Sequence, residues 1–210
     1  MTGSLALVTG PTAEPITLED TKAFAHVTND DDDALIGQLI TTAREYFDGP
    51  YAWFARALMP QTWDLMLPCF PLGPASDPYA YNYGLAYDPY LYNMIELPLP
   101  PLQSVTSILY VDPAGVTQTL APSAYTVDTQ HEPGRIMPVY GTYWPTTRYY
   151  IPNAVTVRFV AGYADAKYVP QDIRTWLMNA VTYLHMNREA PALPDVFLWS
   201  MARYKITWPL

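Results

Sequence analysis

The sequence predicts an α+β protein: terminal helices packed as a small helical bundle, with an inserted antiparallel β sandwich or small barrel of about six strands. Apolar residues recur every three or four positions near both ends of the chain and alternate with polar ones in its middle. Half of the 210 residues are hydrophobic and only 15% are charged, which excludes global disorder. The 22 Pro and 18 Tyr against 10 Gly indicate many turns and extended connections.

Residues 1–16 are expected to form an irregular leader, and the first sequence signals of a helix follow it. Thr17 precedes Asp20 in an imperfect capping box, so the first helix should begin there and end near residue 26 or 27. A second helix follows the acidic run, which one of residues 30–32 can cap, and Gly49-Pro50 should stop or bend it. Its apolar stripe comprises Leu35, Ile36, Leu39, Ile40, Ala43, Tyr46 and Phe47.

Alternating patterns then predict strands at residues 62–67, 94–97, 105–111, 116–120, 125–128, 135–139 and 154–161. Pro170 is suited to the first turn of a third helix that should end near residues 187–190, and a short helix is expected over 195–202. We therefore expect a helical domain from residues 1–60 and 165–210. A β domain over 61–164 would carry a Tyr- and Pro-rich insertion at residues 71–93.

The charge is unevenly distributed. The net charge is −9, and the first fifty residues hold nine acidic and two basic residues. No basic stripe is present, so tight binding to a phosphate backbone is not expected. No run of about eighteen apolar residues appears, which argues against a membrane span. With one cysteine and no signal-peptide pattern, we expect a soluble protein made in a reducing cytoplasm.

Catalytic, phosphate-binding and metal motifs are missing from the sequence. His26, His131 and His185 are isolated, and surface or partly buried imidazoles explain them better than catalysis. Cys69 reads as a small apolar residue rather than a nucleophile. The run Asp30, Asp31, Asp32 and Asp33 lacks the alternating oxygens and central Gly of a calcium loop, which favours helix capping and a solvated acidic face. We expect no enzyme activity, cofactor or metal.

The Tyr-rich insertion has several possible roles. Its tyrosines are Tyr79, Tyr81, Tyr83, Tyr87, Tyr90 and Tyr92. They could form a stacking platform for sugars or bases, but residues 71–93 contain no Lys or Arg, which makes nucleic acid a poor ligand. A protein–protein contact is the better functional interpretation. A self-packed loop fits equally well.

Several segments, in order along the chain, carry a family resemblance. The stretch EPITLEDTKA at 14–23 leads into DALI at 33–36, and QTW (61–63), LP (97–98) and PPLQSV (100–105) follow. Then come YVD (110–112) with Gly115, YTVD (125–128), PGRI (133–136), VTVRFVAGY (155–163), VP (169–170) with Ile173, and NRE (187–189). Together they resemble the head–tail connector (adaptor) proteins of tailed phages, in the long subgroup with a β insertion. The insertion and residues 49–53 depart from the pattern.

The resemblance implies a structural role without catalytic residues. Such proteins form a ring, usually dodecameric, under the portal protein in the virion neck, where they extend the DNA channel and offer a docking surface to a tail or stopper protein. DNA would pass through without specific binding, and the chain would be made in the cytoplasm of a host bacterium. The alternative from a different class is a monomeric carbohydrate-binding β sandwich that uses the Tyr-rich insertion.

Three surfaces are candidates for contacts in such an assembly. Residues 195–210 should dock on the portal or an adjacent subunit, because Pro191 and Pro194 let them leave the subunit body. The candidate contact residues in this segment are Phe197, Trp199, Met201, Tyr204 and Trp208. The tyrosines of the insertion should contact a neighbour or the tail. Asp30 to Asp33 should face the DNA channel, where like charge keeps phosphates mobile.

Overall fold

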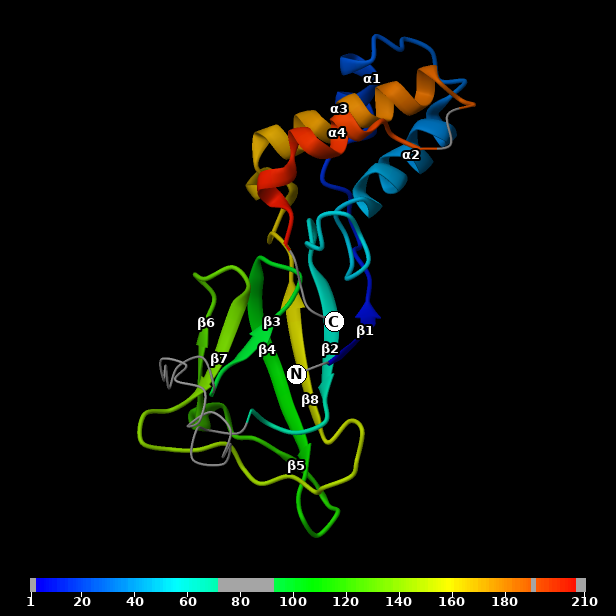
Figure 1. Cartoon of the computed structure of the whole chain (residues 1–210). Coiled ribbons are helices and arrows are strands. Elements are labelled where there is room, and N and C mark those ends of the chain that lie inside the picture. Colours follow the sequence, from blue (N-terminus) through cyan, green and yellow to red (C-terminus); the bar gives the residue numbers. More distant parts are fainter. Residues whose placement is uncertain (1–2, 72–92, 190–191, 207–210) are drawn as a thin grey trace. The chain divides into compact units, whose positions relative to one another are not determined.

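A computed structural model describes residues 3–71, 93–189 and 192–206 (Figure 1). The chain divides into two compact units, each assembled from separate stretches of sequence. Of the described residues, 3–9 and 62–161 form one unit, called here the β unit, and 10–61 with 162–206 form the other, the helical unit. The fold is therefore mixed, with helices and strands held in different units.

The helical unit contains α1 (Leu18–Phe24), α2 (Asp33–Glu45), α3 (Gln171–Met186) and α4 (Asp195–Ser200), with 3-10 turns η3 (Ala166–Tyr168) and η4 (Ala202–Tyr204). The cap expected at Thr17 is confirmed, because its Oγ1 accepts from the backbone N–H of Asp20 at 3.0 Å. Asp32 stands at the N-cap of α2, but its side chain makes no capping bond. Residues 51–59 contain no helical turn.

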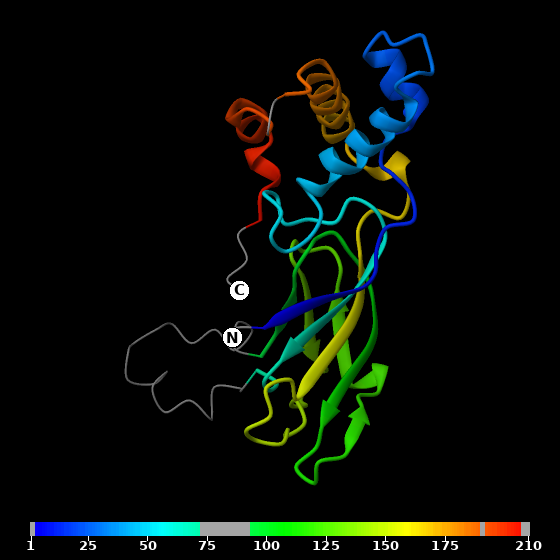
Figure 2. The same cartoon turned by 90° about the vertical axis from the view of Figure 1, so that its right-hand side faces the viewer.

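One apolar core fills the helical unit. The expected stripe of the second helix is confirmed, because Ile36, Ile40 and Phe47 are buried, and α3 adds Ile173, Leu177 and Ala180 to the same core. Trp176 stands edge-on to Phe47 and Phe54, with ring centroids 5.1 and 5.8 Å apart. Figure 2 shows α1, α2 and α3 gathered in this unit. Within the described residues, no helix has both the length and the apolarity needed to cross a membrane.

The β unit holds two open sheets. Five strands lie in the order β1 (Ser4–Thr9), β2 (Gln61–Leu67), β8 (Val155–Ala161), β4 (Leu102–Val111) and β5 (Thr117–Thr119). Three more lie in the order β3 (Ile95–Leu97), β7 (Gly134–Pro138) and β6 (Tyr125–Asp128), beside the turn η2 (Pro122–Ala124). The pairings of β1 with β2, β4 with β5 and β8, and β7 with β3 and β6 are antiparallel. Neither sheet closes on itself among the described residues, so the small-barrel alternative is wrong.

Most expected strands are confirmed within a few residues. β2 alternates as expected, with Trp63, Leu65 and Leu67 buried. A turn at residues 112–115 joins β4 to β5, as the expected strands on either side of it require: Gly115 N–H donates to the Asp112 carbonyl at 2.8 Å, and Gly115 adopts φ +88°. The irregular leader is wrong for residues 4–9, which form a strand paired with β2, whereas residues 10–16 are irregular as expected. β1 lies at a sheet edge and is largely exposed, so it carries no clear period-two pattern to reveal it.

Candidate functional site

Most of the acidic run is ion-paired. Lys22 Nζ lies 2.6 Å from Asp30 Oδ1 and 2.6 Å from Asp33 Oδ1, which ties α1 to the start of α2. The hydrogen bond and charge of Lys22 lower the pKa of Asp30 below its ordinary value. Asp31 accepts instead from the side-chain amide of Asn29 at 2.8 Å.

Asp32 is held by the far end of α3. Its Oδ2 lies 2.9 Å from His185 Nε2 and 2.7 Å from Arg188 Nη2. The hydrogen bond from His185, together with the charge of Arg188, lowers the pKa of Asp32, although partial desolvation opposes the shift. These contacts explain the missing N-cap bond, since the carboxylate turns to α3 rather than to its own helix. The carboxylates of Asp30 and Asp31 remain the exposed part of the run.

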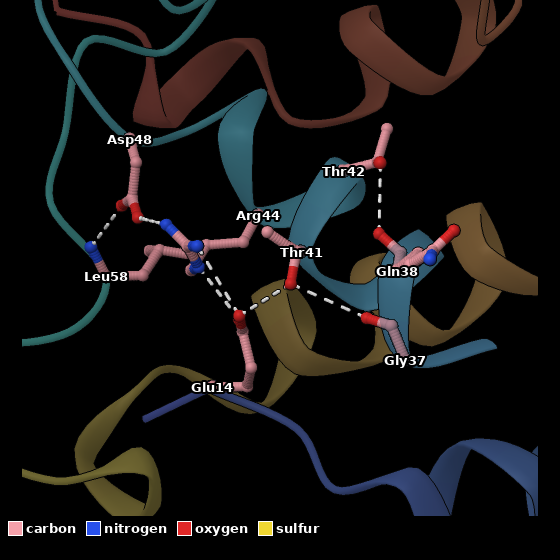
Figure 3. Close-up of polar contacts among 8 residues, drawn as sticks. All are labelled: Glu14, Gly37, Gln38, Thr41, Thr42, Arg44, Asp48 and Leu58. Carbon is pink, nitrogen blue, oxygen red and sulfur yellow. Dashed lines mark hydrogen bonds and ion pairs between the residues drawn. The ribbon is translucent and has the colours of Figure 1, made fainter. Parts of the chain in front are cut away.

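A buried ion-pair network lies further along α2 (Figure 3). Arg44 Nε donates to Glu14 Oε2 at 2.7 Å, and its Nη1 donates to Asp48 one turn later in the chain. Asp48 also accepts from the backbone N–H of Leu58 at 2.9 Å, and Glu14 accepts from the Thr41 hydroxyl at 2.9 Å. Burial raises the pKa of the Asp48 carboxyl. The network joins the leader, α2 and the segment before β2, so its role is to hold the helical unit together.

The candidate docking residues of segment 195–210 differ in whether they are packed against the helical unit or exposed. Phe197, Met201 and Tyr204 turn into their own unit: Met201 is buried, Phe197 packs on Trp176 and Tyr183, and the Tyr204 hydroxyl donates to Asp172 at 2.8 Å. Trp199 remains 73% exposed, one turn after Val196, which is 70% exposed. Trp208 lies outside the described residues. Residues 195–206 thus pack on the helical unit, and Trp199 is the described residue free to act as an anchor.

The six tyrosines of the insertion also lie outside the described residues. The residues that border this segment, Pro71 and Asn93, line a cavity of about 380 Å³ together with Tyr143 and Tyr149. Two stacked aromatic rings also line this cavity: Phe70 and Trp144 have ring centroids 4.9 Å apart. The Trp144 indole N–H donates to the Asn93 carbonyl at 2.9 Å.

A second tyrosine cluster lies between β7 and β8, and the sequence analysis missed it. Tyr140, Tyr143, Tyr149 and Tyr150 are all highly exposed. The loop that carries them is anchored by Trp144, by buried Thr147 and by the Arg148 N–H, which donates to the Val111 carbonyl at 3.0 Å. The density of Tyr over residues 140–150 was the available signal. Anchored loops that expose tyrosines are typical of protein-contact surfaces.

No arrangement for catalysis or metal binding appears in the described residues. Within them, no group of three His, Cys, Asp or Glu side chains could hold a metal ion. Among the carboxylates described above, those of Glu14, Asp30, Asp32, Asp33 and Asp48 are held in ion pairs, and Asp31 accepts from Asn29. What these surfaces offer is contact area, with exposed aromatic rings on both units and exposed carboxylates on the helical unit.

Comparison with known proteins agrees with the resemblance found in the sequence. Residues 15–54, which contain α1 and α2, match a family model described as phage gp6-like head–tail connector protein. The match confirms the resemblance to this family over those residues. No curated protein matches the chain.

Solved structures share the fold over nearly the whole chain. A chain from the "neck of empty GTA particle computed with C6 symmetry" has a TM-score of 0.72 and 19% identity, covering 99% of this chain and 97% of that one. One from the "virion of native gene transfer agent (GTA) particle" has a TM-score of 0.69, 20% identity and coverages of 98% and 97%. One from the "neck of native GTA particle computed with C12 symmetry" has a TM-score of 0.59, 20% identity and coverages of 99% and 97%.

Proposed function

We propose that this chain is a head–tail connector: a structural, non-enzymatic virion protein of the neck. The observation that carries the proposal is the fold shared over 99% of the chain with a protein from the neck of a phage-like particle. The match of residues 15–54 to the phage connector family supports it independently, since it rests on sequence. In this role the chain forms a ring under the portal protein, extends the DNA channel and offers a docking surface to a tail or stopper protein.

A ring is supported by the symmetry named for the similar structures, six-fold in one and twelve-fold in another. A ring requires a heterologous interface, in which one face of a subunit binds a different face of the next. The chain has exposed aromatic residues for such contacts, among them Trp199 and the tyrosines of residues 140–150. Its net charge of −9 suits a channel through which DNA slides.

The proposal extends to the packing of the two sheets and to the roles of the helical unit and the β unit. The two sheets would pack as a sandwich over the fully buried Ile108, Ile136 and Val157. The helices would form the connector body, and the β unit would carry the insertion outward to a neighbour or the tail. The chain would be made in the host cytoplasm before it joins the neck.

The test is the composition of purified particles. Quantitative mass spectrometry should find this chain at about portal stoichiometry, within a factor of two, as expected of matched rings. Particles that lack the chain, or a purified chain that binds glycans as a monomer and never joins portal-containing heads, would overturn the proposal. The second result would favour the carbohydrate-binding alternative.

A further inference from the structure

The four edge strands of the two sheets differ in charge. In the three-stranded sheet the edges are β3 and β6, which carry Glu96 and Asp128. In the five-stranded sheet the edges are β1, with the sequence SLALVT, and β5, with the sequence TQT, and neither contains a charged residue. Charged side chains on an edge strand discourage pairing with another chain. Only the five-stranded sheet therefore lacks this protection, and it lacks it at both edges.

β1 pairs with β2 along one edge, and no described residue pairs with its other edge. Residues 4–7 pair in continuous register with residues 63–66 of β2, and the register shifts between Leu7 and Thr9. Gly3 lies so close to β2 that an added Cβ would come within 2.8 Å of Leu67. Leu7 is nevertheless 52% exposed, and no hydrogen bond joins the outer side of β1 to any other described residue. Every second residue of 4–7 therefore directs its backbone N–H and C=O groups away from β2, toward the open edge of the sheet.

The opposite edge of the same sheet is shorter but also uncharged. β5 pairs with β4 through Thr117, Gln118 and Thr119, and all three residues are exposed. Its outer side presents the same kind of unpaired backbone groups, with uncharged side chains. The three residues of β5 can all pair within the four-residue segment of β1 that keeps a continuous register.

We infer that β1 of one copy pairs with β5 of the next copy, so that the five-stranded sheets continue from subunit to subunit. The inference rests on the ring of the proposed function, since it names the surfaces that the ring would join. A second copy is the occupant because the two uncharged edges are different strands of one sheet. Their pairing is heterologous, the kind of contact that a closed ring requires, whereas pairing of β1 with β1 would stop at a dimer.

A charge-swap experiment tests this pairing. Leu7→Lys and Thr119→Glu each place one charge on an exposed side chain of one edge, and neither position lies in the core. Wild type, each single variant and the double variant are mixed with the portal protein of the same particle, and rings are counted by native mass spectrometry. We expect rings from wild type, loss of rings from each single variant, and recovery in the double variant, where the introduced lysine on β1 of one copy would face the introduced glutamate on β5 of the next.

The possible outcomes distinguish failure of the proposed ring from failure of the pairing between β1 and β5. If wild type forms no ring, the proposed function fails and the inference fails with it. If wild type and both single variants all form rings, the function stands and the edge pairing is overturned. If the double variant stays unassembled while its far-UV circular dichroism and thermal midpoint match wild type, β1 does not face β5. Recovery in an equal mixture of Leu7→Lys and Leu7→Glu chains, without recovery in the double variant, would show β1–β1 pairing instead.

Discussion

Arg44 and Asp48 form an ion pair one helical turn apart, with side chains only 10% and 7% exposed. Glu14 completes the charge balance from the leader, so one guanidinium serves two carboxylates from separate stretches of chain. A buried carboxylate that loses its cation keeps its desolvation cost without compensation. The stability of the helical unit therefore depends on this pair more than on its surface ion pairs.

Arg44→Leu should lower the free energy of unfolding of the helical unit by about 3 kcal/mol, because it strands the buried Asp48 carboxylate. Urea denaturation followed by Trp fluorescence measures the change. Arg188→Leu is the matched control, since its side chain is 58% exposed and pairs with Asp32 at the surface. The control should cost less than about 1 kcal/mol. Equal losses in the two variants would contradict the structural role given to the buried network.

Asp32 should make the stability of the helical unit depend on pH. Its pKa is lowered below 3.8 in the folded chain by the hydrogen bond from His185, with Arg188 adding to the effect. A lowered folded-state pKa contributes stability that is present above the unfolded pKa and is lost as the pH falls through the folded one. The difference in thermal midpoint between wild type and Asp32→Asn should therefore shrink below pH 3.8. Asp31→Asn, which removes a carboxylate that accepts from Asn29 and not from a cation, is the control for the loss of one charge from the same acidic run.

The exposed carboxylates of the acidic run should influence the movement of DNA. Asp30→Asn with Asp31→Asn should keep the fold, because Lys22 retains its ion pair with Asp33 and the carboxylate of Asp31 accepts from Asn29 alone among the described residues, and should slow DNA ejection by removing like charge from the channel wall. Ejection is followed in single particles by dye fluorescence. Glu45→Gln, at an exposed position at the end of α2, serves as the control. A neck reconstruction with Asp30 and Asp31 on the outer rim would refute the channel assignment.

Trp199 should anchor the chain to the portal or an adjacent subunit. Because it is 73% exposed, Trp199→Ala should leave the thermal midpoint unchanged while weakening binding to portal-containing heads by about 2 kcal/mol, roughly thirtyfold. Tyr168→Ala, at an exposed aromatic elsewhere in the helical unit, is the control. Deleting residues 195–210 is a blunter test, since it also removes buried Leu198 and Met201. Trp208 is predicted to act with Trp199. If the Trp199→Ala chain completes heads normally, Trp199 is not the residue that anchors the chain to the portal or an adjacent subunit.

The insertion should matter to assembly more than to folding. Pro71 and Asn93 line the same cavity, so a short linker can replace residues 74–92 without displacing the strands. The shortened chain should keep its unfolding free energy and assemble less well with portal or tail proteins. As a control, replacing only the tyrosines in this segment with Ser tests whether the rings carry the contact. A loss of several kcal/mol in the isolated chain would instead make the segment part of the core.

The sequence by itself determined the elements whose signals are local. The stripe of Ile36, Ile40 and Ala43 specifies α2, and the alternation of Trp63, Leu65 and Leu67 specifies β2, because each pattern matches the period of its own backbone. The Thr17 cap and the turn at Gly115 were also readable, since each is complete within four residues. The resemblance to phage connectors rested on the same kind of linear evidence.

Only the tertiary structure decided what the polar and edge residues do. One of residues 30–32 was expected to cap α2, but at the N-cap position the carboxylate of Asp32 is taken by His185 and Arg188, more than 150 residues away. β1 became a strand because β2 supplied its partner, and Phe197 with Met201 faced inward because the helical core lay open to them. An ion pair or a strand edge is satisfied by whichever group the fold brings near. No local period records such long-range partners, and these contacts follow from the packing of the whole chain.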